Sequence, residues 1–170
     1  EIQCADARQA YTQAKLDGVR TWVRLPRERW PPEWAGMKDP VVPLVLALYG
    51  HPDSGGYWEK HCDRHLKLQG YKPINDWPSC YWHPRLKLFL VVYVDDFKLA
   101  GPKENLAEGW RLITQPGPGG SKGLEIEEPA KMDRFLGAHH RFSEGWVNDD
   151  GEFTPKVPKT KTKGKKVKVI

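Results

Sequence analysis

One apolar stretch, residues 88–97, constrains the fold more than any other part of the chain. It reads Leu-Phe-Leu-Val-Val-Tyr-Val-Asp-Asp-Phe and lies between the breakers Pro84 and Gly101. A run of β-branched and aromatic residues between such breakers predicts a buried β-strand or hairpin. Asp95 and Asp96 interrupt the run, and neighbouring strand residues point to opposite faces, so the pair is not one simple solvated edge.

Two interpretations of Asp95 and Asp96 are open at this point. An Asp-Asp pair is typical of a tight turn between two hydrophobic strands. Alternatively, the carboxylates hold a cation, because burying an ionised carboxylate is costly unless a cation or several donors compensate it.

The remaining periodicity predicts an α+β fold. Residues 57–68 place apolar side chains at helical spacing, and residues 104–113 do the same. Residues 80–94 are typical of a β-hairpin, and residues 135–142 of a further strand. We therefore expect an antiparallel sheet with helices packed on one face.

Length and composition predict a domain over residues 1–145 and a basic, disordered tail over residues 146–170. Seven Lys lie in residues 156–170; without them the 27 basic residues fall to 20, against 22 acids, so the +5 charge belongs to the tail. Such a tail either binds a phosphate backbone, acts as a nuclear import signal or stays solvated. With no signal pattern, three Cys and no run near ~20 apolar residues, we expect an intracellular protein, in a cytoplasmic particle or the nucleus, not secreted and not in a membrane.

Six short motifs follow one another in an order that resembles the palm of a reverse transcriptase of copia-type LTR retrotransposons. They span about residues 3–142, and Tyr-Val-Asp-Asp is the most specific of them. The others are Asp6-Ala7-Arg8-Gln9-Ala10-Tyr11, Val23-Arg24-Leu25-Pro26, Leu48-Tyr49-Gly50 with Trp58, Asn105-Leu106, and Phe135-Leu136-Gly137.

The resemblance implies an RNA-directed DNA polymerase that uses two Mg²⁺ ions, dNTPs and an RNA or DNA template–primer duplex. By analogy, Asp6 and Asp95 are the favoured metal ligands, and Asp96 contributes to the second ion or to the geometry. The chemistry agrees, because Mg²⁺ prefers carboxylate oxygens and phosphoryl transfer needs charge neutralisation. Without a metal, two carboxylates about 4 Å apart would repel by about 4 kcal/mol at an effective dielectric near 20.

The resemblance also assigns substrate contacts. Tyr11 would close the sugar pocket against a 2′-hydroxyl, with Ala10 and Tyr93 as further nucleotide-binding residues. The segment Phe135, Leu136 and Gly137 would seat the primer terminus. An ordinary core tyrosine is the alternative for Tyr11.

Two departures from the family pattern affect these expectations. Asp53 stands where the family usually has Gln before the palm helix, which puts a template or nucleotide contact in doubt. The motifs begin with the first palm motif, so we expect fingers and thumb to be missing or incomplete. The isolated chain should then polymerise weakly or not at all, and work within the remainder of a retrotransposon polyprotein.

A second metal site is suggested by two Cys-x-x-His pairs. The pairs are Cys62 with His65 and Cys80 with His83, and His61 could substitute for one ligand. Two thiolates and two imidazoles suit a structural Zn²⁺. On a regular strand Cys80 and His83 would diverge, so zinc requires His83 to lie in the following turn. The alternative is buried cysteines with surface histidines.

Two other functions remain open from the sequence. The chain could be a non-catalytic nucleic-acid-binding module whose lysine tail supplies affinity. It could also be a zinc-stapled structural remnant of a retroelement.

Overall fold

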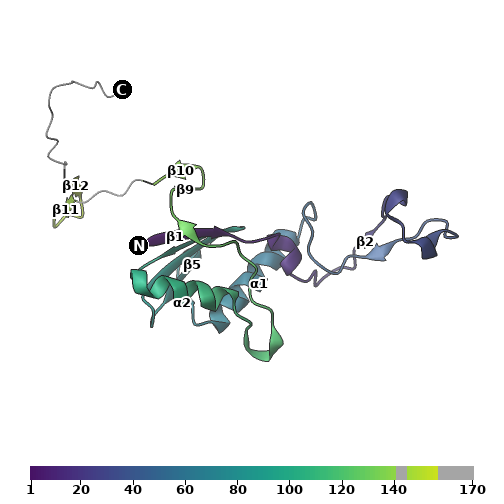
Figure 1. The fold of residues 1–170 in the computed structure, drawn as a ribbon, viewed down its shortest axis with the longest axis horizontal. Helices are drawn as coiled ribbons and strands as arrows, with labels where there is room; N and C mark the ends of the chain where they lie inside the picture. Colours follow the sequence, from purple (N-terminus) through teal and green to yellow (C-terminus); the bar gives the residue numbers. More distant parts are fainter. Residues whose placement is uncertain (141–144, 157–170) are drawn as a thin grey trace, which may run out of the picture.

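The computed structural model describes residues 1–140 and 145–156. Its centre is a six-stranded antiparallel sheet with strand order β4-β5-β6-β7-β1-β8 (Figure 1). The strands are β1 (Ile2–Asp6), β4 (Lys72–Ile74), β5 (Trp77–His83), β6 (Leu88–Tyr93), β7 (Asp96–Ala100) and β8 (Ala130–Lys131).

Two helices, α1 (Ser54–Leu68) and α2 (Lys103–Thr114), cover one face of this sheet. Side-chain burial along β6 alternates accordingly. Leu88 and Leu90 are fully buried under the helices, whereas Phe89 and Val91 on the other face are half-buried. The mixed fold with an antiparallel sheet and two helices is therefore confirmed. Among the described residues, no helix combines the length and apolarity needed to cross a bilayer.

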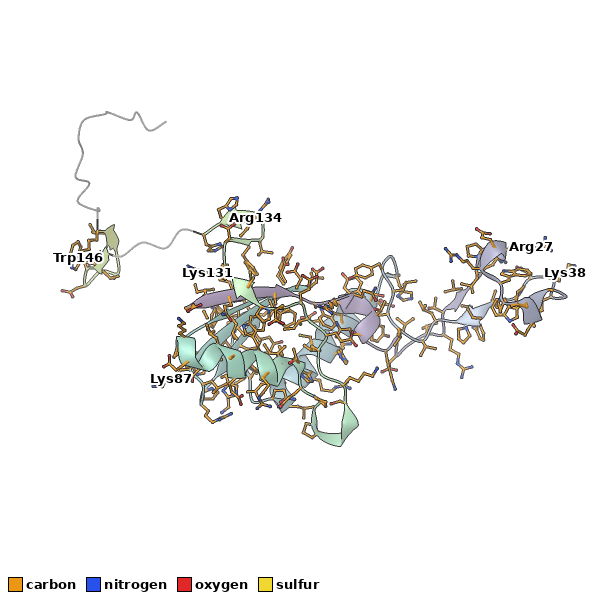
Figure 2. All side chains as sticks on the ribbon, viewed as in Figure 1. Arg27, Lys38, Lys87, Lys131, Arg134 and Trp146 are labelled. Atoms are coloured by element: carbon orange, nitrogen blue, oxygen red, sulfur yellow. The ribbon has the colours of Figure 1, made fainter. Side chains whose placement is uncertain are left out.

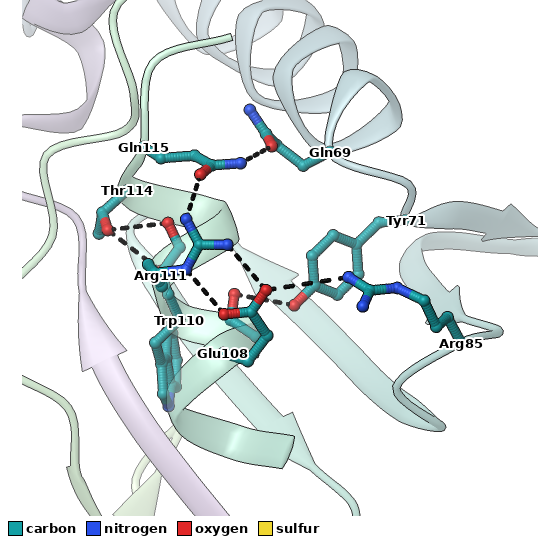
Figure 3. Close-up of polar contacts among 9 residues, drawn as sticks. Gln69, Tyr71, Arg85, Glu108, Trp110, Arg111, Thr114 and Gln115 are labelled. Atoms are coloured by element: carbon teal, nitrogen blue, oxygen red, sulfur yellow. Dashed lines mark hydrogen bonds and ion pairs between the residues drawn. The ribbon is translucent and has the colours of Figure 1, made fainter.

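The packing of α2 against the sheet rests on a close approach at Gly109. The Tyr71 hydroxyl donates a hydrogen bond of 3.1 Å to the Gly109 carbonyl (Figure 3). Around it, Glu108 pairs with Arg111 at 2.7 Å and with Arg85 at 3.8 Å. These ion pairs are exposed and contribute little, so α2 is held by its buried side chains, such as Leu106 and Ile113, and by the contact at Gly109.

Residues 15–48 form an arm that projects from the body (Figure 1). Its short strands β2 (Trp22–Val23) and β3 (Val42–Pro43) pair with each other. The 3-10 helices η2 (Arg27–Arg29) and η3 (Pro32–Trp34) occupy the tip, where prolines exclude longer regular structure. An edge-on contact of Trp30 with Trp34, with centroids 6.3 Å apart, holds the tip together.

The region after α2 differs from the sequence expectation in two places. Residues 135–142 were expected as one strand, but the chain turns back, and β9 (Arg134–Phe135) pairs with β10 (Ala138–His139). The reversal follows from positive φ at Leu136 (49°) and Gly137 (81°), which matches a two-residue hairpin turn. Part of the expected disordered tail also forms a hairpin, β11 (Gly145–Val147) with β12 (Phe153–Pro155), while its lysine-rich end lies outside the described residues.

Because of the close contact at Gly109, replacing this glycine by alanine should destabilise the protein although alanine favours helices. A Cβ on Gly109 would lie 2.4 Å from Leu88 Cδ1 and 3.0 Å from Leu99 Cδ2. We expect Gly109→Ala to lower the free energy of unfolding by about 1–3 kcal/mol, because the overpacked core outweighs the better helix propensity. Urea denaturation measures the change.

Gly56→Ala in α1 is the matched control. A Cβ at this exposed position meets nothing within 4 Å. The same substitution should therefore stabilise the protein by up to about 1 kcal/mol. Equal effects of the two substitutions would contradict the close packing of α2 on the sheet.

Candidate metal centre

The strand register brings Asp6 and Asp96 together. Asp6 ends β1, Asp96 begins β7, and the two residues are directly paired across the antiparallel ladder. Asp96 is also paired with Tyr93 of β6. Facing residues of an antiparallel pair project to the same side, so both carboxylates lie on the sheet face opposite the helices.

The pKa of Asp96 shows how these neighbouring carboxyl groups affect each other. The pKa of Asp96 is raised, first by partial burial, then by the negative charges of Asp6 and Asp95, and by a side-chain hydrogen bond with Asp6. A hydrogen bond between two carboxyl groups requires a shared proton. Unless a proton or a cation lies between Asp6 and Asp96, the pair is therefore repulsive.

Asp95 has a different position from the one the sequence favoured. The sequence named Asp6 and Asp95 as the main pair, whereas the structure places Asp96 opposite Asp6 and Asp95 in the β6–β7 turn. The Asp95 carbonyl accepts a 2.7 Å hydrogen bond from the Ala7 amide. Within residues 1–140 and 145–156, no three acidic, His or Cys side chains converge on one metal position. The candidate centre is thus a pair of carboxylates with Asp95 as a nearby charge.

A pocket of about 270 Å³ opens over the pair, and the β9–β10 hairpin forms its other wall. All three residues of the predicted primer segment (Phe135, Leu136 and Gly137) line this pocket together with Asp6 and Asp96. Residues separated by about 130 positions in the sequence therefore line the same pocket.

Two further side chains line the pocket that the sequence did not single out. Arg134 directly precedes the predicted primer segment and adds a cation to an acidic pocket (Figure 2). Cys4 lies two residues before Asp6, so strand alternation puts it on the same face. That alternation was the available signal for Cys4, whereas nothing in the sequence showed that Arg134 would face the acids.

The three predicted nucleotide-binding residues differ in how exposed they are. Tyr11 lies in the 3-10 helix η1 (Ala10–Gln13), with its ring centroid 4.5 Å from that of Tyr49. Ala10 is fully buried, so its side chain cannot contact a nucleotide. Tyr93 is 57% exposed and shares the open face with Asp96.

The four proposed zinc ligands do not assemble. Cys80 lies on the open face of β5, whereas Tyr81 and His83 alternate onto the helix face, where Cys62 and His65 are also buried. The sheet therefore separates Cys80 from the other three. His83 Nδ1 instead accepts a hydrogen bond from the Leu86 amide at 3.2 Å, so His83 is a satisfied core residue.

Burial also opposes thiolate formation at Cys62. The pKa of the Cys62 thiol is raised strongly, mainly by burial and further by Asp63 and Glu59. A zinc ligand must be deprotonated, so this surrounding disfavours Cys62 as a ligand.

Comparison with known proteins adds no relative. Neither a scan against protein-family models nor a search of curated proteins gives a match.

The raised pKa of Asp96 predicts a pH-dependent effect of Asp96→Asn. A carboxyl whose pKa is higher in the folded state stabilises the fold when protonated, and that contribution is lost as pH rises from its unfolded pKa of about 3.9 through the folded value. We expect Asp96→Asn to be more stable than the unsubstituted chain at pH 7 in EDTA, with the difference shrinking toward pH 3. Urea denaturation across this range measures it.

The control is Asp39→Asn in the arm. Asp39 makes an exposed ion pair with Arg24 at 2.8 Å and should show no comparable gain at neutral pH. A pH-independent effect of Asp96→Asn would argue against a repulsive Asp6–Asp96 pair.

Proposed function

We propose that the chain is the palm of a copia-type reverse transcriptase, an RNA-directed DNA polymerase of a retrotransposon polyprotein. One observation carries the proposal: the Tyr-Val-Asp-Asp hairpin presents Asp96 beside Asp6, the acid of the first palm motif. The two residues are 90 positions apart, and the shared pocket includes the segment matched to the primer-binding motif.

The donor set suits Mg²⁺. Carboxylate oxygens are the hard ligands this ion prefers, and one or two carboxylates plus substrate phosphates are a common Mg²⁺ site. Asp6 and Asp96 would hold the metal, with Asp95 adding negative charge. Bound Mg²⁺ would activate a primer 3′-hydroxyl and neutralise the charge that develops on the phosphate.

The chain's own residues would position the substrates. Phe135, Leu136 and Gly137 form the pocket wall against which a primer end would rest. Arg134 offers a cation for a phosphate close to the acidic pair. Tyr93 is exposed on the same face and would contact the duplex, and Tyr11 would select deoxynucleotides. Other parts of a polyprotein would contribute further contacts to the duplex and the triphosphate.

Divalent-metal binding at the acidic pair is the first test of this proposal. Mn²⁺ and Mg²⁺ should raise the melting temperature of the unsubstituted chain, because a ligand of the native state stabilises it by mass action. Asp6→Asn and Asp96→Asn should each abolish the shift, whereas Asp39→Asn should retain it. Differential scanning calorimetry measures all four proteins.

The location of the metal can be mapped directly. Fe²⁺ bound in place of Mg²⁺ should, with ascorbate and peroxide, cleave the backbone near residues 6, 96 and 135, which line one pocket. Metal stabilisation that survives both Asn substitutions, or cleavage elsewhere, would contradict the site.

Polymerisation itself requires the chain to be joined to fingers and thumb segments of a copia-type enzyme. The fusion should extend a DNA primer on an RNA template with Mg²⁺. Asp96→Asn should reduce extension by about a hundredfold or more, since losing a metal-mediated charge interaction costs several kcal/mol. Equal extension by the substituted and unsubstituted fusions would refute the catalytic assignment.

A further inference from the structure

A second, larger groove lies apart from the acidic pocket. It has a volume of about 1590 Å³ and is lined by α1, η1 and residues 120–127. Neither Asp6 nor Asp96 lines it. Small-molecule sites are usually about 300–1000 Å³, so the size favours an extended ligand.

Basic side chains outnumber acidic ones in the lining of this groove, which we name the basic groove. Its cations are Arg8, Lys15, Lys60, Arg64 and Lys122, against the acids Asp17, Glu125 and Glu127. All five cations are exposed. None of them forms an ion pair with another described residue, so all five are available to an anionic ligand.

The wall of the groove formed by α1 alternates cations with rings. Tyr57, Lys60, His61 and Arg64 follow one another at spacings of three, one and three residues, which places them on one helical face. The Lys60 ammonium lies 5.9 Å from the centroid of the Tyr57 ring. Cations that follow a phosphate backbone and rings that stack on bases are the two elements of single-strand binding.

A buried acceptor in the wall has no protein partner. His65 is 3% exposed, lines the groove, and its Nε2 lies 2.8 Å from the Ile113 carbonyl. Because a carbonyl only accepts, Nε2 carries the hydrogen and Nδ1 is an acceptor. Nδ1 has no hydrogen-bond partner among the described residues. Burial lowers the pKa of His65, which keeps the ring neutral.

We propose that the basic groove binds single-stranded nucleic acid, as a site separate from the acidic pocket. Phosphates would contact Lys60, Arg64 and Lys122, and bases would stack on Tyr57 and His61, while the buried His65 only forms part of the wall. A duplex hides the faces of its bases, so it cannot use these rings. The binding needs no divalent metal and does not depend on the polymerase assignment.

Fluorescence anisotropy with labelled oligo(U) and oligo(dT) of about ten nucleotides, a length within the range of known single-strand sites, tests the proposal. The assay uses the full chain in EDTA. Lys60→Glu/Arg64→Glu should weaken binding roughly twentyfold at 0.1 M salt and reduce the salt slope by about 0.7 for each lost phosphate contact. The RNA and DNA arms show whether a 2′-hydroxyl contributes.

The matched control is Lys72→Glu/Lys87→Glu. Both lysines are exposed, neither lines the groove, and Lys87 lies at the end of the body away from the arm (Figure 2). The net charge change is the same and the lysine-rich tail is retained in both proteins. We expect less than a threefold effect. Equal weakening in the two double variants, or tighter binding of a duplex than of single strands, would overturn the proposal.

Lysine footprinting of the unsubstituted chain tests the binding site even if a variant misfolds. Oligo(U) should protect Lys60 and Lys122 from acetylation, as measured by mass spectrometry, while Lys72 and Lys87 stay reactive. Full reactivity of Lys60 and Lys122 would overturn the site. Because the assay is run in EDTA, binding measured there separates this site from the proposed metal centre.

Discussion

The turn between β6 and β7 is the constraint on which the site depends. Val94 has a φ of 55°, a conformation that costs a β-branched residue about 1–3 kcal/mol. Two hydrogen bonds hold the turn: the Trp58 indole donates to the Val94 carbonyl at 2.6 Å, and the Ala7 amide donates to the Asp95 carbonyl at 2.7 Å. Helix α1, strand β1 and the hairpin tip are thereby fixed to one another, and the register that places Asp96 beside Asp6 follows.

The geometry also separates the two interpretations of the Asp-Asp pair. A turn explains Asp95, which occupies the loop. It does not explain Asp96, which is already in β7 and paired with Tyr93 and Asp6. The raised pKa of Asp96 means that its charged form is disfavoured in the fold. A neutral residue at this half-buried strand position, next to another acid, would therefore make the protein more stable. In the proposed function, a bound cation would remove this penalty on the charged form.

Much of the fold followed from local patterns, while the details of the site depended on long-range pairing. The buried strand at residues 88–93 and both helices were predicted from the sequence. Which aspartate faces Asp6 depends on how β1 docks against β7, a contact across 90 residues that no local pattern encodes. The four zinc ligands suggested by spacing also do not converge, because strand alternation places Cys80 on the other face of the sheet. The reversal at Leu136 was missed because Leu rarely adopts positive φ.

The sheet's two faces restrict where polar chemistry can occur. Helices α1 and α2 cover one face with apolar side chains, the paired carboxylates lie on the other face, and the basic groove lies where α1 meets η1 and residues 120–127. The end of β1 serves both regions: Asp6 projects to the open face, Ala7 is buried, and Arg8 lines the groove. Within the described residues Arg8 makes no ion pair with Asp6, which matters because a paired guanidinium would compete with a metal for the carboxylate. One buried residue, Ala7, therefore separates a carboxylate on the open face from a guanidinium in the groove.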